Sequence, residues 1–94
     1  MINRGDRAVI RDGVMFNRVG DEIVILDLDS GTYFGLDAVG SRLWDLIAGN
    51  HTIAEAMERM LEEYEVTAEE LDRDVFQLLR ELEEKKLLAA QRGE

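Results

Sequence analysis

The sequence contains no cysteine and no proline. The absence of cysteine excludes disulfide bonds, thiolate metal ligands and thiol nucleophiles. The absence of proline excludes proline-rich ligand segments. Uninterrupted apolar runs such as residues 23–26 are far shorter than the roughly 20 residues that a membrane helix needs. We therefore expect a soluble, cytoplasmic protein with no membrane partner.

Basic side chains are also scarce, and the few present are unevenly placed. Residues 1–20 contain four basic and two acidic side chains, whereas residues 21–94 contain seven basic and 19 acidic ones, so the net charge is −10. The phosphates of DNA and RNA would repel such a surface, because Lys and Arg supply most of the nonspecific affinity for nucleic acid. The composition argues against a nucleic-acid partner and favours a basic one.

The length of the chain sets a limit on its architecture. With 94 residues, of which 46% are hydrophobic, the chain can fold as one domain but is short for a deep, enclosed active site. We expect a single domain over residues 1–94, with flexible ends at residues 1–13 and 89–94.

The first half of the sequence has the composition of β-strands. Residues 14–19 and 22–28 are rich in β-branched and apolar side chains, and the Gly-Asp dipeptide between them indicates a hairpin. A second turn, Asp-Ser-Gly, precedes the strand-forming residues 32–36. The pattern predicts a three-stranded antiparallel meander, with residues 8–11 as a short edge piece.

After residue 36 the apolar residues recur with the helical period of about 3.6. Side chains that cap helix N-termini mark three starts: Asp37, and the pairs Thr52-Glu55 and Thr67-Glu70. The third helix is expected to extend to about residue 86. Because the helices must bury their apolar stripes against the sheet, the prediction is an α+β, winged-helix-like domain with an N-terminal three-stranded sheet followed by three helices.

The acidic segment DLDSGTYFGLD, residues 27–37, has three possible interpretations: a calcium loop, a catalytic carboxylate pair or a turn. An EF-hand loop starting at Asp27 needs Gly at its sixth position and Glu at its twelfth, where this chain has Thr32 and Ala38. We therefore predict a plain turn and no metal site. A small enzyme that uses Asp27 and Asp29 stays open as a less favoured hypothesis.

Other candidates for chemistry have ordinary structural explanations. His51 is the only histidine, and no nearby acid or nucleophile completes a catalytic set, so an exposed loop residue is favoured. Trp44 lies beside the apolar stripe of the first helix, so we expect a partly buried side chain that seals the sheet. The sequence predicts no catalytic residue and no cofactor.

The third helix carries an aromatic residue that its core stripe does not need. At 100° per residue, Phe76 lies about 140° from Leu71 and outside the core stripe. Phe76 is either an incidental exposed aromatic or one wall of a groove. The strand at residues 32–36 could form the second wall, because its edge lacks Lys and Pro and could pair with an extended peptide or with a second copy of the chain.

Taken together, the segments resemble a known family. The run VILDLDSGTYFGLDAVGSRLWDLIAG, a helix that starts with Thr, and the helix DVFQLLRELEEKKLL resemble the PqqD family of peptide-modification chaperones, also called RiPP recognition elements. Within it the chain is most similar to the small standalone leader-binding proteins of lasso-peptide clusters, over about residues 14–88. Related chains often have Asn where Asp37 stands, but both residues cap helices well.

The resemblance implies a function without catalysis. Such a domain holds the leader segment of a ribosomally made precursor peptide as an extra antiparallel strand, packed against the third helix. It then presents the precursor to a leader peptidase and to an ATP-dependent cyclase. Carried over to this sequence, the leader-binding residues would be Thr32, Tyr33, Phe34, Gly35, Val75, Phe76, Leu79, Arg80 and Glu83.

A winged-helix DNA-binding regulator is the alternative to a leader-binding protein. The short turn between the second and third helices suggests it. However, the third helix would present mainly Asp and Glu side chains to the DNA phosphates, which disfavours this function.

Overall fold

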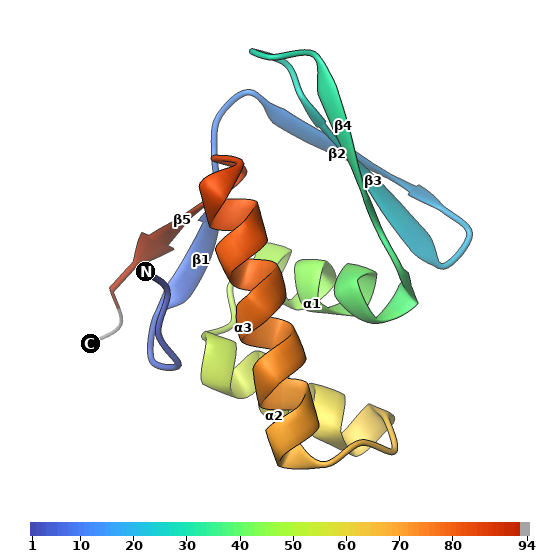
Figure 1. Cartoon of the computed structure of the whole chain (residues 1–94), viewed down its shortest axis with the longest axis vertical. Helices are drawn as coiled ribbons and strands as arrows, with labels where there is room; N and C mark the ends of the chain where they lie inside the picture. Colours follow the sequence, from blue (N-terminus) through green and yellow to red (C-terminus); the bar gives the residue numbers. More distant parts are fainter. Residues whose placement is uncertain (93–94) are drawn as a thin grey trace.

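A three-stranded sheet lies across one end of a group of three helices, and a second, two-stranded sheet lies beside them (Figure 1). The computed structural model describes residues 1–92. The elements are β1 (Arg7–Ile10), β2 (Val14–Val19), β3 (Glu22–Asp27), β4 (Thr32–Leu36), α1 (Ala38–Ala48), α2 (Ile53–Glu63), α3 (Ala68–Glu84) and β5 (Leu88–Gln91). The predicted α+β order of three strands and three helices is confirmed, while the likeness to a winged helix is loose.

Strands β2, β3 and β4 form the predicted antiparallel meander, in that order. Gly20 has a φ of 64°, which a two-residue hairpin turn between β2 and β3 requires. One transverse row of the sheet, Phe16, Ile25 and Phe34, faces the helices, and Ile25 within it is fully buried. The sheet thus has one face on the core and one face toward solvent.

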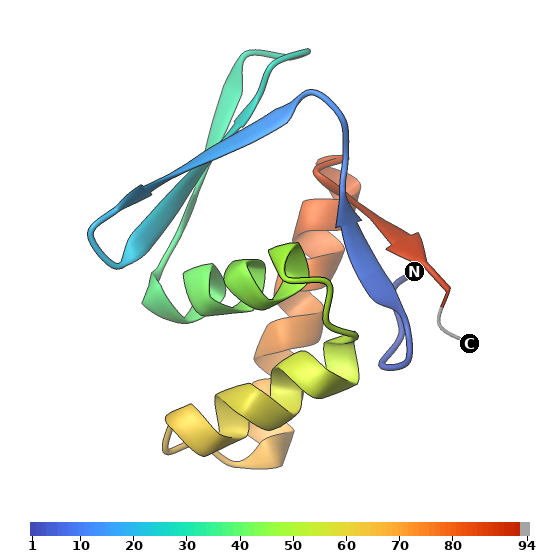
Figure 2. The same ribbon diagram turned by 180° about the vertical axis from the view of Figure 1, so that it is seen from behind.

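In Figure 2, helix α1 lies directly beneath this sheet, and α3 lies behind α1. The side chain of Asp37 accepts a hydrogen bond from the Gly40 N–H at 2.8 Å and caps α1, as the sequence predicts. Trp44 of α1 is 0% exposed, so the expectation of a partly buried side chain is wrong. Its ring packs edge to face against Phe16 of β2, with centroids 5.5 Å apart, which explains the full burial.

The two-stranded sheet was predicted only in part. Strand β1 corresponds to the expected edge piece, but it pairs with β5 and not with the meander. Strand β5 was not predicted. The flexibility expected of residues 1–13 and 89–94 stays a prediction, although β1 and β5 pair within these segments; residues 93–94 lie outside the described part of the chain. Within residues 1–92, no helix is long and apolar enough to cross a membrane.

Helix α2 begins with the predicted capping box. The Thr52 hydroxyl accepts a hydrogen bond from the Glu55 N–H at 3.2 Å, and the Glu55 carboxylate accepts one from the Thr52 N–H at 2.8 Å. We expect Thr52→Ala to lower the free energy of unfolding by about 1 kcal/mol, because it removes one of these bonds. Urea denaturation at pH 7 measures the change, and an unchanged midpoint would contradict it.

The capping box also predicts a pH dependence. The hydrogen bond from the Thr52 backbone lowers the pKa of the Glu55 carboxyl below its usual value. A lowered pKa in the folded state stabilises the fold above the usual pKa, and this contribution is lost as the pH falls through the lowered value. The Glu55→Gln variant should therefore show a weaker loss of stability on acidification than the unmodified chain.

Candidate functional site

Strand β4 stands at the edge of the meander, and within residues 1–92 only β3 pairs with it. The two-residue turn after Val19 makes Val19 and Glu22 a hydrogen-bonded pair, and hydrogen-bonded pairs alternate along an antiparallel ladder. By this alternation Phe34 directs its N–H and C=O toward β3. Tyr33 and Gly35 therefore direct theirs to the open edge, where an added strand could bond to them.

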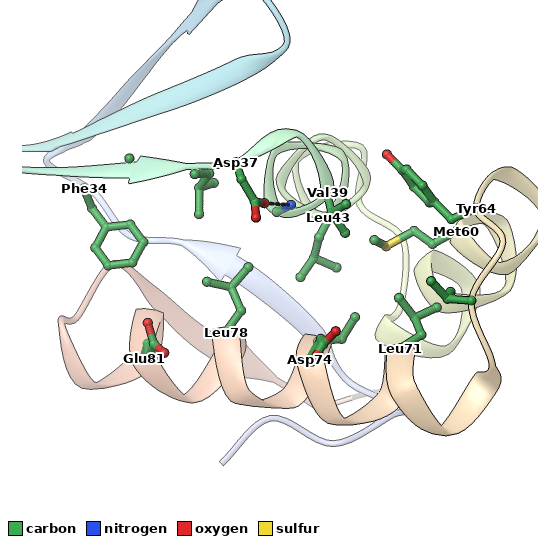
Figure 3. A pocket seen from close by; sticks show the side chains of 15 residues that line it. Phe34, Asp37, Val39, Leu43, Met60, Tyr64, Leu71, Asp74, Leu78 and Glu81 are labelled. Atoms are coloured by element: carbon green, nitrogen blue, oxygen red, sulfur yellow. Dashed lines mark hydrogen bonds between the residues drawn. The ribbon is translucent and has the colours of Figure 1, made fainter.

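A groove of about 510 Å³ lies between this edge and α3, and α1 and α2 close its far end (Figure 3). Most of the accessible surface that lines it is apolar. The lining residues are Phe34, Gly35, Leu36, Asp37, Val39, Gly40, Leu43, Met60, Tyr64, Val66, Leu71, Asp74, Val75, Leu78 and Glu81. The sequence hypothesis of a groove between the third predicted strand and the third helix is thus matched by a real depression in the surface.

The β4 wall is formed by every second side chain of the strand, as the pleat dictates. Phe34 points into the groove in Figure 3 and is half-buried, and Leu36 is buried. Tyr33, between them, lies on the opposite face and is 71% exposed. The groove therefore receives one aromatic side chain from β4, and that side chain is Phe34.

The α3 wall combines buried and exposed residues of one helical flank. Leu71 and Val75 form part of the floor and are buried, and Leu78 is half-buried above them. Asp74 and Glu81 are exposed and border Leu78 on the outer rim. The wall is therefore apolar at its base and acidic at its rim.

The close approach of α3 to α1 depends on Gly40. A Cβ at this position would lie 3.2 Å from Cδ2 of Leu78 and 3.2 Å from Oδ1 of Asp37, which is tighter than ordinary side-chain contact. Any larger residue would push Leu78 outward and narrow the groove. No role was predicted for Gly40, because the contact joins two helices that are distant in the sequence.

The charges around the groove have one sign over most of its length. All three charged residues that line it, Asp37, Asp74 and Glu81, are acidic. The ammonium group of Lys85 lies 5.5 Å from the ring centroid of Phe34, at one end of the groove. Because low-dielectric walls focus the field of nearby charges, these carboxylates favour a negative potential at the opening.

Three of the nine predicted site residues line the groove, namely Phe34, Gly35 and Val75. Thr32 and Tyr33 lie on the same strand but outside the groove lining, and Arg80 is exposed on α3. Leu79 is only 1% exposed and belongs to the core. Whether any of these residues binds a ligand stays a prediction.

Phe76 and Glu83 lie on the other flank of α3, away from β4. Residues 1–5 cover this flank: the Arg4 guanidinium lies over the Phe76 ring, 5.4 Å from its centroid, and the terminal amine of Met1 is 3.2 Å from Glu83. Arg4 also pairs with Asp72. The expectation that Phe76 faces the groove is therefore wrong in its geometry, because the N-terminal segment takes that surface.

Sequence reasoning missed Asp74, Leu78 and Glu81, which form the groove flank of α3. The helical wheel places them at about −60°, −20° and −80° from Leu71, on the side opposite Phe76. Leu78 was assigned to the core stripe. The available signal was the pair of acidic residues seven positions apart that border this leucine, which indicates a partly exposed apolar edge.

The turn at residues 27–32 has the geometry of a plain turn. One Asp27 carboxylate oxygen accepts a hydrogen bond from the Asp29 N–H at 3.1 Å, and the other accepts one from the Ser30 hydroxyl at 2.9 Å. Gly31 has a φ of 72°, as this turn requires. The prediction of a turn is confirmed. Over residues 1–92, no group of three or more His, Cys, Asp or Glu is placed to hold a metal ion.

Comparisons with known proteins find relatives of this chain. A family model described as coenzyme PQQ synthesis protein D (PqqD) matches residues 22–88. A solved structure described as "TbiB1 in Complex with the TbiA(beta) Leader Peptide" is 42% identical, with a TM-score of 0.82, over 85% of this chain and 93% of that one.

A second solved structure, "Lasso peptide synthetase B1 complexed with the leader peptide", is 23% identical, with a TM-score of 0.81, over 88% of this chain and 98% of that one. At this identity the likeness shows a shared fold. No curated protein matches the sequence.

Proposed function

Because the chain belongs to the PqqD family, we propose that it binds the leader segment of a ribosomally synthesised precursor peptide as an added strand on β4. The observation that carries the proposal is the open edge of β4 beside an apolar groove on α3. The TbiB1 structure supports it, because that protein is 42% identical and is in complex with a leader peptide. Neither comparison supports the alternative of a DNA-binding regulator.

The site suits an extended peptide for two physical reasons. Backbone groups of Tyr33 and Gly35 can bond to a guest strand of any sequence, which gives affinity. Every second side chain of that guest would point to the same face as Phe34 and enter the groove, which gives specificity. The guest would run antiparallel to β4 and continue the antiparallel meander.

We further propose a place for the protein in lasso-peptide biosynthesis. It would present the bound precursor to the leader peptidase of the pathway and then to the ATP-dependent cyclase, in the cytoplasm. The protein would act without catalysis or a cofactor of its own. The shallow groove, whose three charged lining residues are all carboxylates, suits a binding role better than a reaction that needs a sheltered acid and base.

The decisive experiment is titration of a fluorescent leader peptide, taken from the precursor gene that neighbours the gene for this protein. We expect saturable binding. Tyr33→Pro should weaken it at least about tenfold, because proline removes the N–H that faces the guest and places its ring there, while an edge strand tolerates it. The peptide should bind at low micromolar concentration or below.

The matched control is Tyr33→Ala. It keeps the backbone N–H and removes only a side chain that points away from the groove, so affinity should stay within about twofold of the unmodified protein. Equal losses for the two variants would argue against strand addition. A leader that does not bind at tens of micromolar would overturn the proposed function.

A further inference from the structure

Two acidic side chains of α3 lie on the rim of the groove. Asp74 and Glu81 are exposed, line the groove and are seven residues apart in the same helix. Seven residues of helix span about 10.5 Å. An extended strand covers this distance in about three residues. Two side chains of a guest strand that are two or four residues apart lie on the same face, so each could reach one of the two carboxylates.

Basic groups near the groove compensate this charge only in part. Arg42 of α1 binds Glu63 through two hydrogen bonds of 2.8 and 2.7 Å, and this contact raises the pKa of the Arg42 guanidinium. The Arg73 side chain is 4.0 Å from Asp74, at the outer limit of an ion pair, and both side chains are about 70% exposed. Lys85 lies over Phe34 at one end. The middle of the rim thus offers two carboxylates to a guest.

Asp37 adds a third carboxylate on the opposite wall. One of its oxygens caps α1 through the Gly40 N–H, so its charge is held in place at the mouth of the groove. A guest strand between β4 and α3 would pass between acidic groups on both sides. An acidic guest would meet repulsion from both walls, whereas a basic guest would meet attraction.

We propose that the groove selects leader segments that carry two Lys or Arg side chains two or four residues apart, directed at Asp74 and Glu81 across an apolar stretch. This inference rests on the proposed function, because it assigns a substrate class to the same site. The apolar floor binds the side chains between the two basic residues. The acidic rim then discriminates among leaders with the same apolar pattern.

The expected change in leader affinity is modest, because both carboxylates are exposed to solvent. An exposed ion pair contributes about 0.2–1 kcal/mol, which is at most about a fivefold change in affinity per pair. Exchanging a basic residue for an acidic one replaces attraction by repulsion, so about a three- to twentyfold change is expected at a facing position. Added salt should reduce this change, because it screens exposed charges.

The test uses the TbiA(beta) leader peptide as a probe, in two series with single Lys or single Glu substitutions along its length. In the unmodified protein, we expect the Lys peptide to bind about three- to twentyfold more tightly than the Glu peptide at two positions, two or four residues apart. In the Asp74→Asn/Glu81→Gln variant, this preference should fall to within about twofold. Fluorescence anisotropy at low and high salt measures both series.

The matched control is Glu69→Gln/Glu84→Gln. It removes the same charge from the same helix, at exposed positions outside the groove, so the Lys preference should persist. Thermal unfolding checks that both variants fold. Binding without a Lys preference, or a preference unchanged in Asp74→Asn/Glu81→Gln, would overturn this inference and leave the proposed function intact. No binding by any peptide of either series, and none by the cognate leader at tens of micromolar, would overturn both.

Discussion

Phe34→Ala should weaken leader binding about thirtyfold. Phe34 is the aromatic side chain that β4 directs into the groove, and it is already half-buried before any guest binds. Truncation of an aromatic residue at the centre of an interface typically costs about 2 kcal/mol or more, which corresponds to this loss. Titration of the fluorescent cognate leader measures the change, and thermal unfolding reports whether the variant keeps its fold.

Phe76→Ala is the matched control for this prediction. It removes the same side chain from the other flank of α3, where Arg4 covers the ring and no residue of the groove is involved. Leader affinity should stay within about twofold, while stability decreases because Phe76 packs against the core. If Phe76→Ala instead weakens binding as much as Phe34→Ala, the leader uses the flank that residues 1–5 occupy.

Much of the fold could be predicted from local signals. Asp37, Thr52 and Thr67 each cap the helix that they were expected to cap, because a cap depends on residues three positions apart in the sequence. The meander was equally local, since a Gly-Asp turn and two β-branched runs fix the pairing of β2 and β3. These elements form from neighbours in the chain, so the sequence alone is sufficient to locate them.

The errors arose where distant segments compete for the same surface. The helical wheel shows that α3 has two flanks beside its core stripe, but it does not show which flank faces β4. Ile2 is 2% exposed, and the N-terminal segment that it anchors lies beside Phe76. The segment then covers Phe76, and the groove forms on the flank of Leu78. Strand β5 was missed for the same reason, because its partner β1 is about 80 residues away in the chain.

The position of β4 relative to α3 depends in turn on how α1 holds the sheet. Three contacts between α1 and the meander are polar. The Ser41 hydroxyl accepts a hydrogen bond from the Ile23 N–H at 2.8 Å and donates one to the Leu36 carbonyl at 3.3 Å. Arg18 of β2 pairs with Asp45 of α1. An apolar contact between Trp44 and Phe16 also joins them. The stability of the binding edge therefore depends on a residue that does not line the groove.

Trp44→Ala should lower the free energy of unfolding by about 3–5 kcal/mol. The side chain is fully buried between α1 and the sheet, and its removal leaves a cavity beside Phe16. A loss of this size is a large part of the stability of a domain of 94 residues. Urea denaturation followed by circular dichroism measures it, because Trp44 is the only tryptophan and its fluorescence is lost in the variant.

Trp44→Phe separates two contributions of this side chain to stability, namely its apolar packing and its unsatisfied N–H donor. Among the described residues, the buried Nε1 of Trp44 has no hydrogen-bond partner, and an unsatisfied buried donor costs about 1–3 kcal/mol. Phenylalanine keeps most of the apolar contact, so the cavity that it leaves is smaller. It also removes the unsatisfied donor, which partly offsets the free-energy cost of that cavity. We expect Trp44→Phe to lose less than half of what Trp44→Ala loses. Equal losses would mean that the indole nitrogen does have a partner in solution, and that the stability of the sheet on α1 depends on this bond as well as on packing.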